Sequence, residues 1–283
     1  MSDFYSVSML KHGVYRITSA ENVFCELLIG SKRAMLIDTG YGFGDLQSVV
    51  KKLTGNKPLI IVNTHGHLDH ACGNAQFDEY VYISEEDFEL CRKHTSEKAR
   101  RSAVKRAEES GKAGEQACVL PDDFKSEAYI SQRADTLLPL NDGVIFFLGG
   151  ITVHAISTPG HTSGSISFLY EEENWLYVGD ATNSCCWLFL RESCGRADYI
   201  ASLDKLIALN PTKVFRSHVA EPTDVETLHL YKRAAVEADY SKGLPFKSPF
   251  AAGEEVRVCA IDGMTMDDFK SPGFAAVVIC ADF

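Results

Sequence analysis

Apolar positions along the first sixty residues fall in short runs that are separated by turns. The runs at 13–17, 23–29 and 34–37 predict three strands of a meander. From 44 to 54, apolar residues recur every three or four positions, which predicts an amphipathic helix. Residues 58–63 are then almost continuously apolar, as in a strand that is buried on both faces. We therefore expect a sheet with a helix packed on it.

The same succession of strands and helices returns after residue 144. Paired apolar runs flank turns and predict hairpins, and two longer stretches have helical periodicity. The predicted elements are hairpins at 144–156 and 165–178, helices at 197–209 and 223–240, and strands at 213–215, 256–260 and 275–279. Strands followed by helices in both halves predict an α/β fold, in which two sheets lie between helices.

Residues 84–135 differ from the rest of the chain in amino-acid composition. They are rich in Glu, Lys, Arg, Ser and Ala, and helical propensity is high from about residue 84 to 111. We interpret 84–135 as a helical insertion with a looser tail, carried by a single domain that spans 1–283. The insertion is a candidate wall or lid of the functional site. The alternative is a solvated surface segment without a functional role. Its basic stretch, Lys98–Arg106, is interpreted as a solvated helix face.

Composition and charge restrict the partners. The chain has 283 residues, of which 45% are hydrophobic, and a formal net charge of -11. This acidity argues against nucleic acid as a partner, because phosphate binding needs a positive field. No apolar run is long enough to cross a bilayer. The first residues lack a basic segment followed by an apolar one, so we expect no secretory signal. The nine cysteines form no C-x-x-C pair and are interpreted as mostly buried, reduced thiols. We expect a cytoplasmic monomer or homodimer that acts on a small molecule and not on a membrane.

The candidate chemistry is concentrated directly after the buried strand at 58–63. Within six residues the chain places His65, His67, Asp69 and His70. Three imidazoles and a carboxylate are more than one ion with an open position needs. The segment therefore predicts two metal sites side by side.

Three further side chains that can bind metal follow predicted strands in the second half. His161 lies in a tight loop, Asp180 follows the strand that ends at 178, and His218 follows the strand at 213–215. In α/β proteins, residues at the carboxyl ends of strands gather at one edge of the sheet. These residues can thus supply the ligands that the histidine loop lacks.

Together these motifs resemble the metallo-β-lactamase-fold hydrolase superfamily. The resemblance extends from about residue 13 to 220 and includes Asp38 in the segment Ile37–Gly40. It implies an αββα sandwich to which the helical insertion is added. It also implies a role for each residue: His65, His67 and His161 bind the first metal, Asp69, His70 and His218 bind the second, Asp180 bridges them, and Asp38 orients the ligand loop from behind.

Imidazole and carboxylate ligands without thiolate suit zinc, iron or manganese, and two zinc ions are our first expectation. Two divalent ions lower the pKa of a shared water, so the resemblance implies a bridging hydroxide as the nucleophile. One metal also polarises the scissile carbonyl or phosphoryl oxygen. Asp180 would take part in catalysis through the bridge, and Asp69 would in addition transfer a proton.

Departures from subfamily patterns narrow the predicted reaction. True β-lactamases usually lack an aspartate at the position of Asp180, so antibiotic hydrolysis is not expected. Residues 63–74 and 158–164 resemble glyoxalase II-like thioesterases and lactonases. However, glyoxalase II proteins tend to have a histidine where Ser165 lies, and homoserine-lactone lactonases have a tyrosine where Asn183 lies. We predict a dinuclear hydrolase of a small ester, thioester or lactone.

Other reaction classes stay open as alternatives. One is a mononuclear iron persulfide dioxygenase, and others are a phosphodiesterase or a non-catalytic metal-binding relative. The segment Cys185–Leu190 is either part of an apolar substrate pocket or part of the core. Four histidines match no motif and are interpreted as ordinary surface or core residues: His12, His94, His154 and His229.

Overall fold

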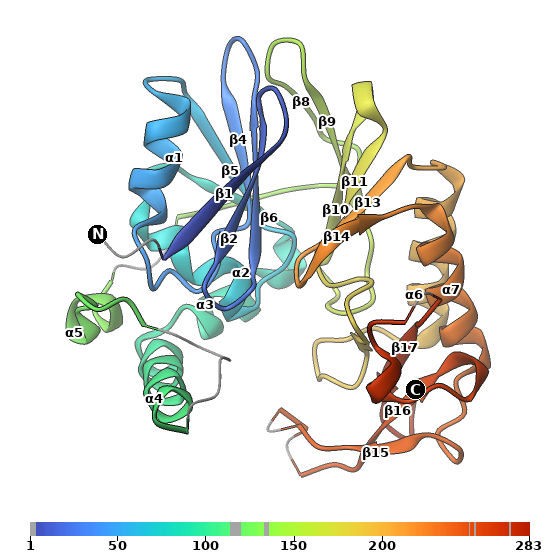
Figure 1. The fold of residues 1–283 in the computed structure, drawn as a ribbon. Coiled ribbons are helices and arrows are strands. Elements are labelled where there is room, and N and C mark those ends of the chain that lie inside the picture. Colours follow the sequence, from blue (N-terminus) through green and yellow to red (C-terminus); the bar gives the residue numbers. More distant parts are fainter. Residues whose placement is uncertain (1–3, 114–119, 133–135, 249, 252, 272) are drawn as a thin grey trace. The chain divides into compact units, whose positions relative to one another are not determined.

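The chain divides into two compact units (Figure 1). Unit 1 consists of Met1–Leu140 and Ile145–Val153, and unit 2 of Asn141–Val144 and His154–Phe283. The structure, a computed structural model, describes residues 4–113, 120–132, 136–248, 250–251, 253–271 and 273–283. The interpretation of 1–283 as a single domain stays a prediction.

Unit 1 contains a seven-stranded sheet whose strands follow one another in chain order. The strands are β1 (Tyr5–Lys11), β2 (Val14–Ser19), β3 (Phe24–Ile29), β4 (Ala34–Ile37), β5 (Leu59–Val62), β6 (Val81–Ile83) and β7 (Leu137–Pro139). β1 to β4 pair antiparallel, and β4 to β7 pair in parallel. Because β4 and β5 run in the same direction, the loops that follow them leave the sheet at the same edge.

Helix α1 (Leu46–Thr54) makes the crossover between β4 and β5 (Figure 1). Its first turn is capped by Asp45, whose carboxylate accepts a hydrogen bond of 2.9 Å from the backbone N–H of Ser48. Leu46 and Val50 are buried in the cluster of apolar side chains that joins the helix to the sheet. The helix that the periodicity predicts is therefore confirmed.

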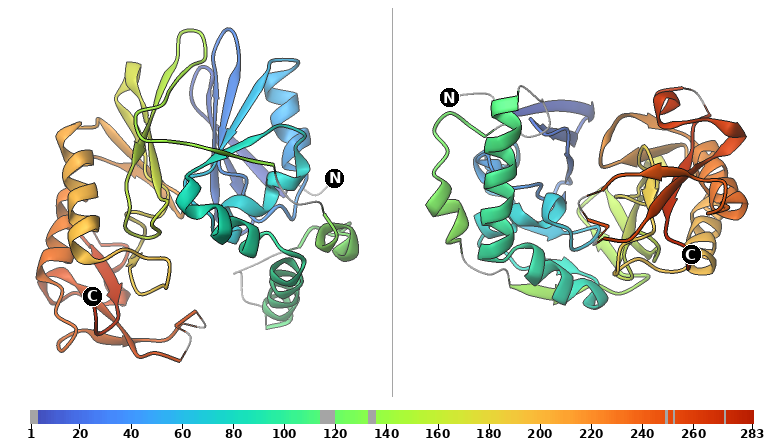
Figure 2. Two further views of the ribbon diagram at one scale, coloured as in Figure 1. Left: turned by 180° about the vertical axis from the view of Figure 1, so that it is seen from behind. Right: turned by 90° about the horizontal axis from the view of Figure 1, so that it is seen from below.

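The predicted insertion contains three α-helices: α3 (Phe88–His94), α4 (Glu97–Ala113) and α5 (Ser126–Ile130). Together with α2 (Leu68–Ala71) they lie at one end of the unit 1 sheet (Figures 1 and 2). The predicted looser tail is wrong at 126–130, because Tyr129 and Ile130 are buried and hold α5 in place. Residues 114–119 and 133–135 of the insertion, with Cys118, lie outside the described residues.

The basic stretch of α4 is a solvated face with one exception. Arg100 is fully buried, whereas the other basic residues of Lys98–Arg106 are exposed. Its guanidinium donates to the carbonyl oxygens of Thr95 at 3.0 Å and Cys72 at 2.9 Å, and to the side chain of Gln132 at 2.5 Å. The prediction of a solvated face is therefore wrong at Arg100, since fixed protein oxygens replace water around its charge.

Unit 2 contains two sheets, with strand orders β14-β13-β11-β10-β9 and β12-β17-β16-β15. The first has β9 (Thr152–Ser157), β10 (Ile166–Tyr170), β11 (Trp175–Tyr177), β13 (Lys213–Arg216) and β14 (Val219–Thr223); the second has β12 (Cys186–Trp187), β15 (Leu244–Phe246), β16 (Val256–Ala260) and β17 (Ala276–Ile279). The remaining strand, β8 (Ile145–Phe147), belongs to unit 1. Short 3-10 helices are η1 (Cys72–Gln76), η2 (Glu85–Asp87), η3 (Glu171–Glu173), η4 (Ile261–Gly263) and η5 (Met266–Asp268).

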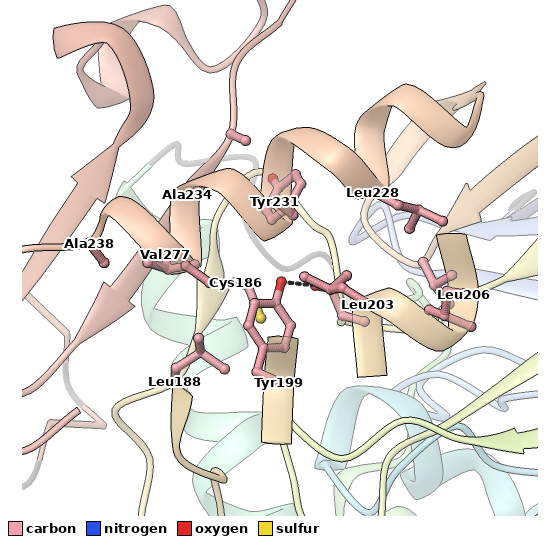
Figure 3. Close-up of a cluster of buried hydrophobic side chains, with 14 of the residues drawn as sticks. Cys186, Leu188, Tyr199, Leu203, Leu206, Leu228, Tyr231, Ala234, Ala238 and Val277 are labelled. Carbon is pink, nitrogen blue, oxygen red and sulfur yellow. Dashed lines mark hydrogen bonds between the residues drawn. The ribbon is translucent and has the colours of Figure 1, made fainter. Parts of the chain in front are cut away.

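Helices α6 (Arg196–Ala208) and α7 (Val225–Glu237) form a core of unit 2 with side chains from both of its sheets, in part shown in Figure 3. Leu203 of α6 and Leu228 of α7 are fully buried, and Cys186 and Val277 come from the smaller sheet. The predicted helices at 197–209 and 223–240 are thus confirmed. Among the described residues, no helix has the length and apolar character that a membrane span requires.

Candidate metal site

The histidine loop leaves β5 beside the residue that follows β4. The backbone N–H of Thr64 donates to Oδ1 of Asp38 at 2.7 Å, and the Thr64 hydroxyl donates to Oδ2 at 2.8 Å. The parallel pairing of β4 and β5 brings these two residues together across 26 positions of sequence. Asp38 therefore contacts the start of the loop.

The same carboxylate contacts the last histidine of the loop. Oδ2 of Asp38 lies 2.9 Å from Nδ1 of His70, and both side chains are buried. Asp38 has a φ of 61°, in the left-handed region that aspartate adopts more readily than most residues other than glycine. With Nδ1 of His70 directed at Asp38, its Nε2 faces Oδ2 of Asp69 at 3.7 Å. The two predicted ligands Asp69 and His70 thus point their donor atoms toward each other.

The other two histidines of the loop also converge. Nε2 of His65 and Nδ1 of His67 are 3.0 Å apart. Two ligands of one tetrahedral zinc, each about 2.0–2.1 Å from it, are roughly 3.4 Å apart, so this spacing suits a shared ion. The Thr64 hydroxyl lies 3.0 Å from Nδ1 of His65, which directs the Nε2 of that ring toward His67.

Asp87 holds the turn between His65 and His67, and the sequence analysis missed it. Its buried carboxylate accepts a hydrogen bond of 2.8 Å from the backbone N–H of Gly66. A Cβ at Gly66 would lie 2.8 Å from the backbone nitrogen of Cys91, so α3 packs directly on the glycine. In the sequence, Asp87 is one of several acidic residues at the start of a helical stretch, where a solvated side chain is the ordinary expectation.

A second group that the sequence analysis missed fixes the backbone of His70. The backbone N–H of Thr39 and the side-chain amide of Asn63 donate hydrogen bonds of 2.8 and 3.1 Å to the carbonyl oxygen of His70. Asn74 donates to the side chain of Asn63 at 2.7 Å and accepts from that of Thr39 at 2.8 Å. All these groups are buried, so the network holds α2 rigidly.

His94, which matches no motif, also belongs to this region. Its ring centroid is 5.0 Å from that of His67, with the planes 30° apart. By contrast, His154 pairs with Glu171 at 2.8 Å. The interpretation of His94 as an ordinary residue therefore misses a ring contact with a predicted ligand.

In unit 2, parallel pairing of β11 and β13 brings Asp180 next to His218. The pairing continues past the strands, because the backbone N–H of Ser217 donates to the carbonyl oxygen of Gly179 at 3.2 Å. Oδ1 of Asp180 lies 3.4 Å from Nε2 of His218, and Oδ2 lies 3.7 Å from Nε2 of His161. Each oxygen of the carboxylate thus faces a different imidazole.

The tautomer of His161 follows from its hydrogen bond. Its Nδ1 lies 2.9 Å from the carbonyl oxygen of Trp187, which can only accept, so Nδ1 carries the proton. In the neutral ring, Nε2 then has the lone pair, and this is the atom that faces Asp180. The hydroxyl of Ser193 donates to the carbonyl oxygen of His161 at 2.9 Å and fixes the loop from the other side.

Tyr199 of α6 supports both ligand loops of unit 2. A Cβ at Gly160 would lie 2.5 Å from the Tyr199 ring, so only glycine allows this approach. The Tyr199 hydroxyl donates to the carbonyl oxygen of Ala181 at 2.6 Å. Nothing in the local sequence distinguishes this tyrosine from an ordinary core residue.

The neighbouring thiols are poor candidates for ligands or nucleophiles. Burial raises the pKa of Cys185 to about 11, and burial also raises the pKa of Cys186. Both therefore stay protonated at neutral pH, whereas metal binding and nucleophilic attack need the thiolate. No disulfide joins any two cysteines in the described part of the chain.

Each unit therefore holds a compact group of nitrogen and carboxylate donors. Unit 1 contributes two pairs, His65 with His67 and Asp69 with His70, and unit 2 contributes Asp180 between two imidazoles. These donors suit zinc, iron or manganese. The donor spacing in both units fits metal binding.

Comparison with known proteins gives a family and a fold. A sequence model described as the Metallo-beta-lactamase superfamily matches residues 19–218. The acyl-coenzyme A thioesterase MBLAC2 of Homo sapiens is 25% identical over 226 residues, which are 73% of this chain and 77% of that protein.

Two solved structures are similar over most of this chain. The metallo-beta-lactamase family protein TTHA1429 from Thermus thermophilus has a TM-score of 0.57 and 23% identity, and 80% of each chain is covered. The sec-alkylsulfatase Pisa1 from Pseudomonas sp. has a TM-score of 0.60 and 12% identity, over 82% of this chain and 42% of that one. At these identities the likeness shows the fold.

The predicted fold class is therefore confirmed, and the thioesterase relative supports the broad class of hydrolase. The family match covers most of the chain and contains every predicted ligand from His65 to His218. The chain belongs to the metallo-beta-lactamase superfamily.

Proposed function

We propose that this chain is a metal-dependent hydrolase of acyl thioesters, within the broader class of small esters, thioesters and lactones. We rank the thioester as the first substrate class because a relative, matched over 77% of its length, is named an acyl-coenzyme A thioesterase. The broader class follows from the motifs of the two ligand loops.

The proposed ligands come from both units. We assign His65, His67 and His161 to a first divalent ion, Asp69, His70 and His218 to a second, and Asp180 to both, with Asp38 as the support of the loop. The combination of the two groups rests on the family motifs. The fit of each group rests on the distances within its own unit.

The position of Asp180 is the observation that carries the proposal. A carboxylate that bridges two ions must offer one oxygen to each, and each ion must have its own imidazole nearby. Oδ1 and Oδ2 of Asp180 face His218 and His161 respectively, at 3.4 and 3.7 Å. A carboxylate that merely paired with one histidine would direct one oxygen elsewhere.

When bound, the two ions supply a hydroxide nucleophile at neutral pH and stabilise the charge that develops on the scissile carbonyl. The residues of the chain then have separate tasks. Asp38 and the carbonyl oxygen of Trp187 fix the tautomers of His70 and His161. Asp69, whose side chain is 24% exposed, is the carboxylate that we assign to proton transfer with the leaving group.

The test is hydrolysis of a panel of substrates by the full chain loaded with zinc or manganese. The panel holds an acyl-coenzyme A thioester, a lactone, a carboxylic ester, a phosphodiester and a β-lactam. We expect turnover of the thioester and two ions per chain by elemental analysis. Asp180→Ala is expected to bind fewer ions and to lose turnover by orders of magnitude, whereas Asp204→Ala, a surface pair with Lys232, is the matched control.

Normal turnover and metal content in Asp180→Ala would refute the bridging role. Turnover of the phosphodiester alone would show that the substrate is a phosphodiester and not an acyl thioester. Oxygen consumption on a persulfide by the iron-loaded chain, with an inert panel, would favour the dioxygenase alternative. For Asp69, an Asn variant that keeps both ions and full turnover would remove its role in proton transfer.

A further inference from the structure

The segment after Asp180 has two faces with different surroundings. Cys186 and Leu188 point into the core beneath α6 and α7 (Figure 3). Trp187 and Phe189 point to the opposite face of the smaller sheet of unit 2. The segment Cys185–Leu190 therefore belongs to the core through alternate side chains and contributes the others to a second surface.

Trp187 is the centre of an aromatic group on the opposite face. Its ring centroid lies 5.4 Å from that of Phe189, 5.9 Å from that of Phe246 and 5.9 Å from that of Phe250. Phe189 is buried, Trp187 and Phe246 are partly buried, and Phe250 is 50% exposed. We call Trp187, Phe246 and Phe250 the aromatic group.

The surroundings of the aromatic group are apolar. The apolar side chains that pack with it include Met264 and Met266, both partly buried. The described residues of this cluster come from strands, loops and one 3-10 turn, and none comes from α6 or α7, which cover the other face. Methionine and aromatic side chains adapt to unbranched hydrocarbon, and an exposed surface of this kind favours an apolar ligand.

The aromatic group is joined directly to the candidate metal site. The residue that carries the central ring, Trp187, accepts the hydrogen bond from Nδ1 of His161 through its carbonyl oxygen. The hydroxyl of Ser193 contacts the carbonyl oxygens of both residues, at 2.9 Å for His161 and 3.4 Å for Trp187. One backbone segment thus orients a proposed ligand and presents the apolar surface.

We propose that the aromatic group is the acyl-chain subsite of this enzyme, and that it binds the hydrocarbon tail of an acyl thioester. The inference rests on the proposed function. The tail is the part of such a substrate that an exposed aromatic surface recognises, whereas the nucleotide end of coenzyme A is charged. Phe246 and Phe250 lie beyond residue 218, where the family match ends, so specificity comes from a part of this chain outside that match.

The test compares kcat/KM for acetyl-, butanoyl-, hexanoyl- and octanoyl-coenzyme A with zinc-loaded full chain. Each methylene that moves from water onto the aromatic group is expected to raise kcat/KM about two-fold. This factor corresponds to half of the transfer free energy of a fully buried methylene, because the surface is partly open. The rise from acetyl to octanoyl is then about 60-fold. Phe250→Ser is expected to reduce this rise about five-fold while leaving acetyl-coenzyme A turnover nearly unchanged.

Phe269→Ser is the matched control, because Phe269 is 44% exposed and lies outside the cluster. Equal chain-length profiles for Phe250→Ser and Phe269→Ser, or a flat profile for the unmodified chain, would overturn the subsite. A dimer that Phe250→Ser dissociates, together with an unchanged profile, would identify the surface as a contact with a second copy instead.

A binding measurement separates failure of the subsite from failure of the proposed function. The chain has two tryptophans, and Trp175→Phe leaves Trp187 as the only one. Decanoate, used below its micellar concentration, is expected to shift the emission of Trp187 to the blue, and acetate is not. One outcome is that no thioester is hydrolysed, decanoate binds, and Phe250→Ser weakens decanoate binding. That outcome would support the subsite and refute the proposed reaction. If thioesters are hydrolysed and decanoate causes no shift, the subsite falls alone.

Discussion

The hydroxyl of Tyr199 donates a hydrogen bond of 2.6 Å to the carbonyl oxygen of Ala181, the residue that follows Asp180. The ring of the same tyrosine packs on Gly160, the residue that precedes His161. One buried side chain of α6 therefore sets the backbone of two loops that carry proposed ligands. Tyr199 thus helps to set the distance between Asp180 and His161, together with the hydrogen bonds of Ser193.

Tyr199→Phe removes the hydroxyl and keeps the ring. The carbonyl oxygen of Ala181 then loses a buried partner, which costs on the order of 1–2 kcal/mol of folding free energy. We expect weaker metal binding, with turnover reduced about ten-fold at limiting zinc and largely restored by excess zinc. Zinc titration followed by turnover checks this expectation.

Tyr240→Phe is the control for that experiment, since its hydroxyl also donates to a backbone carbonyl oxygen, that of Glu255, at 3.0 Å. A smaller loss of stability in Tyr240→Phe, whose hydrogen bond is exposed, and weaker zinc binding only in Tyr199→Phe are the expected pattern. Equal zinc affinity in the two variants would contradict the positioning role of Tyr199.

Gly66→Ala should disturb the ligand loop of unit 1. A Cβ there would lie 2.8 Å from the backbone nitrogen of Cys91 and 3.0 Å from the carbonyl oxygen of Asp87. Because both neighbours are backbone atoms, the turn or α3 must move, and His65 and His67 move with the turn. We expect at least a ten-fold loss of metal affinity by competition with a chelator. Gly195→Ala, where a Cβ meets no atom within 4 Å, should leave affinity unchanged.

The proposed ligands could be predicted from the sequence because each lies in a short motif that follows an apolar run. Such runs predict strands wherever the strand is buried, as at β4 and β5. The edge strand β1 was missed because it has no continuous apolar run: Tyr5, Val7 and Met9 alternate with polar residues, and most of the strand is exposed. The three-residue strands β6 and β7 are too short to give a periodic signal.

The residues that support the ligand loops and α4 could not be predicted from the sequence, because their partners are distant along the chain. Asp87 contacts Gly66 across 21 positions, Arg100 contacts Cys72 across 28, and Tyr199 contacts Ala181 across 18. Each residue has the local sequence of an ordinary helix. Only the tertiary structure shows that an acidic or basic side chain in a charged helical stretch is buried.

Arg100 should prove essential for the docking of α4. Its guanidinium is fully buried, donates to Cys72 in η1 and lies 5.0 Å above the ring of Tyr129. Arg100→Met keeps much of the volume but leaves buried carbonyl oxygens unpaired, so we expect a loss of about 2–4 kcal/mol of stability. Denaturant unfolding measures it. Arg101→Met, one residue away with a side chain that is 54% exposed, should change stability by less than about 0.5 kcal/mol.

Glu21 should make stability depend on pH. Burial raises the pKa of its carboxyl group in the folded chain from 4.5 to about 7. The folded state then holds the proton more tightly than the unfolded state. The stability that this group contributes is therefore complete below about pH 4.5 and is lost as the pH rises through about 7.

Glu21→Gln should remove that loss. Between pH 5 and pH 8, the stability of the unmodified chain should fall by on the order of 2 kcal/mol more than that of the variant. Urea unfolding at both pH values, with a chelator present to exclude metal binding, gives the comparison. Glu108→Gln, which changes an exposed carboxylate on α4, is the control and should follow the unmodified chain. A Glu21→Gln variant that lost stability between the two pH values as much as the unmodified chain would show that Glu21 is ionised in the folded protein at pH 5.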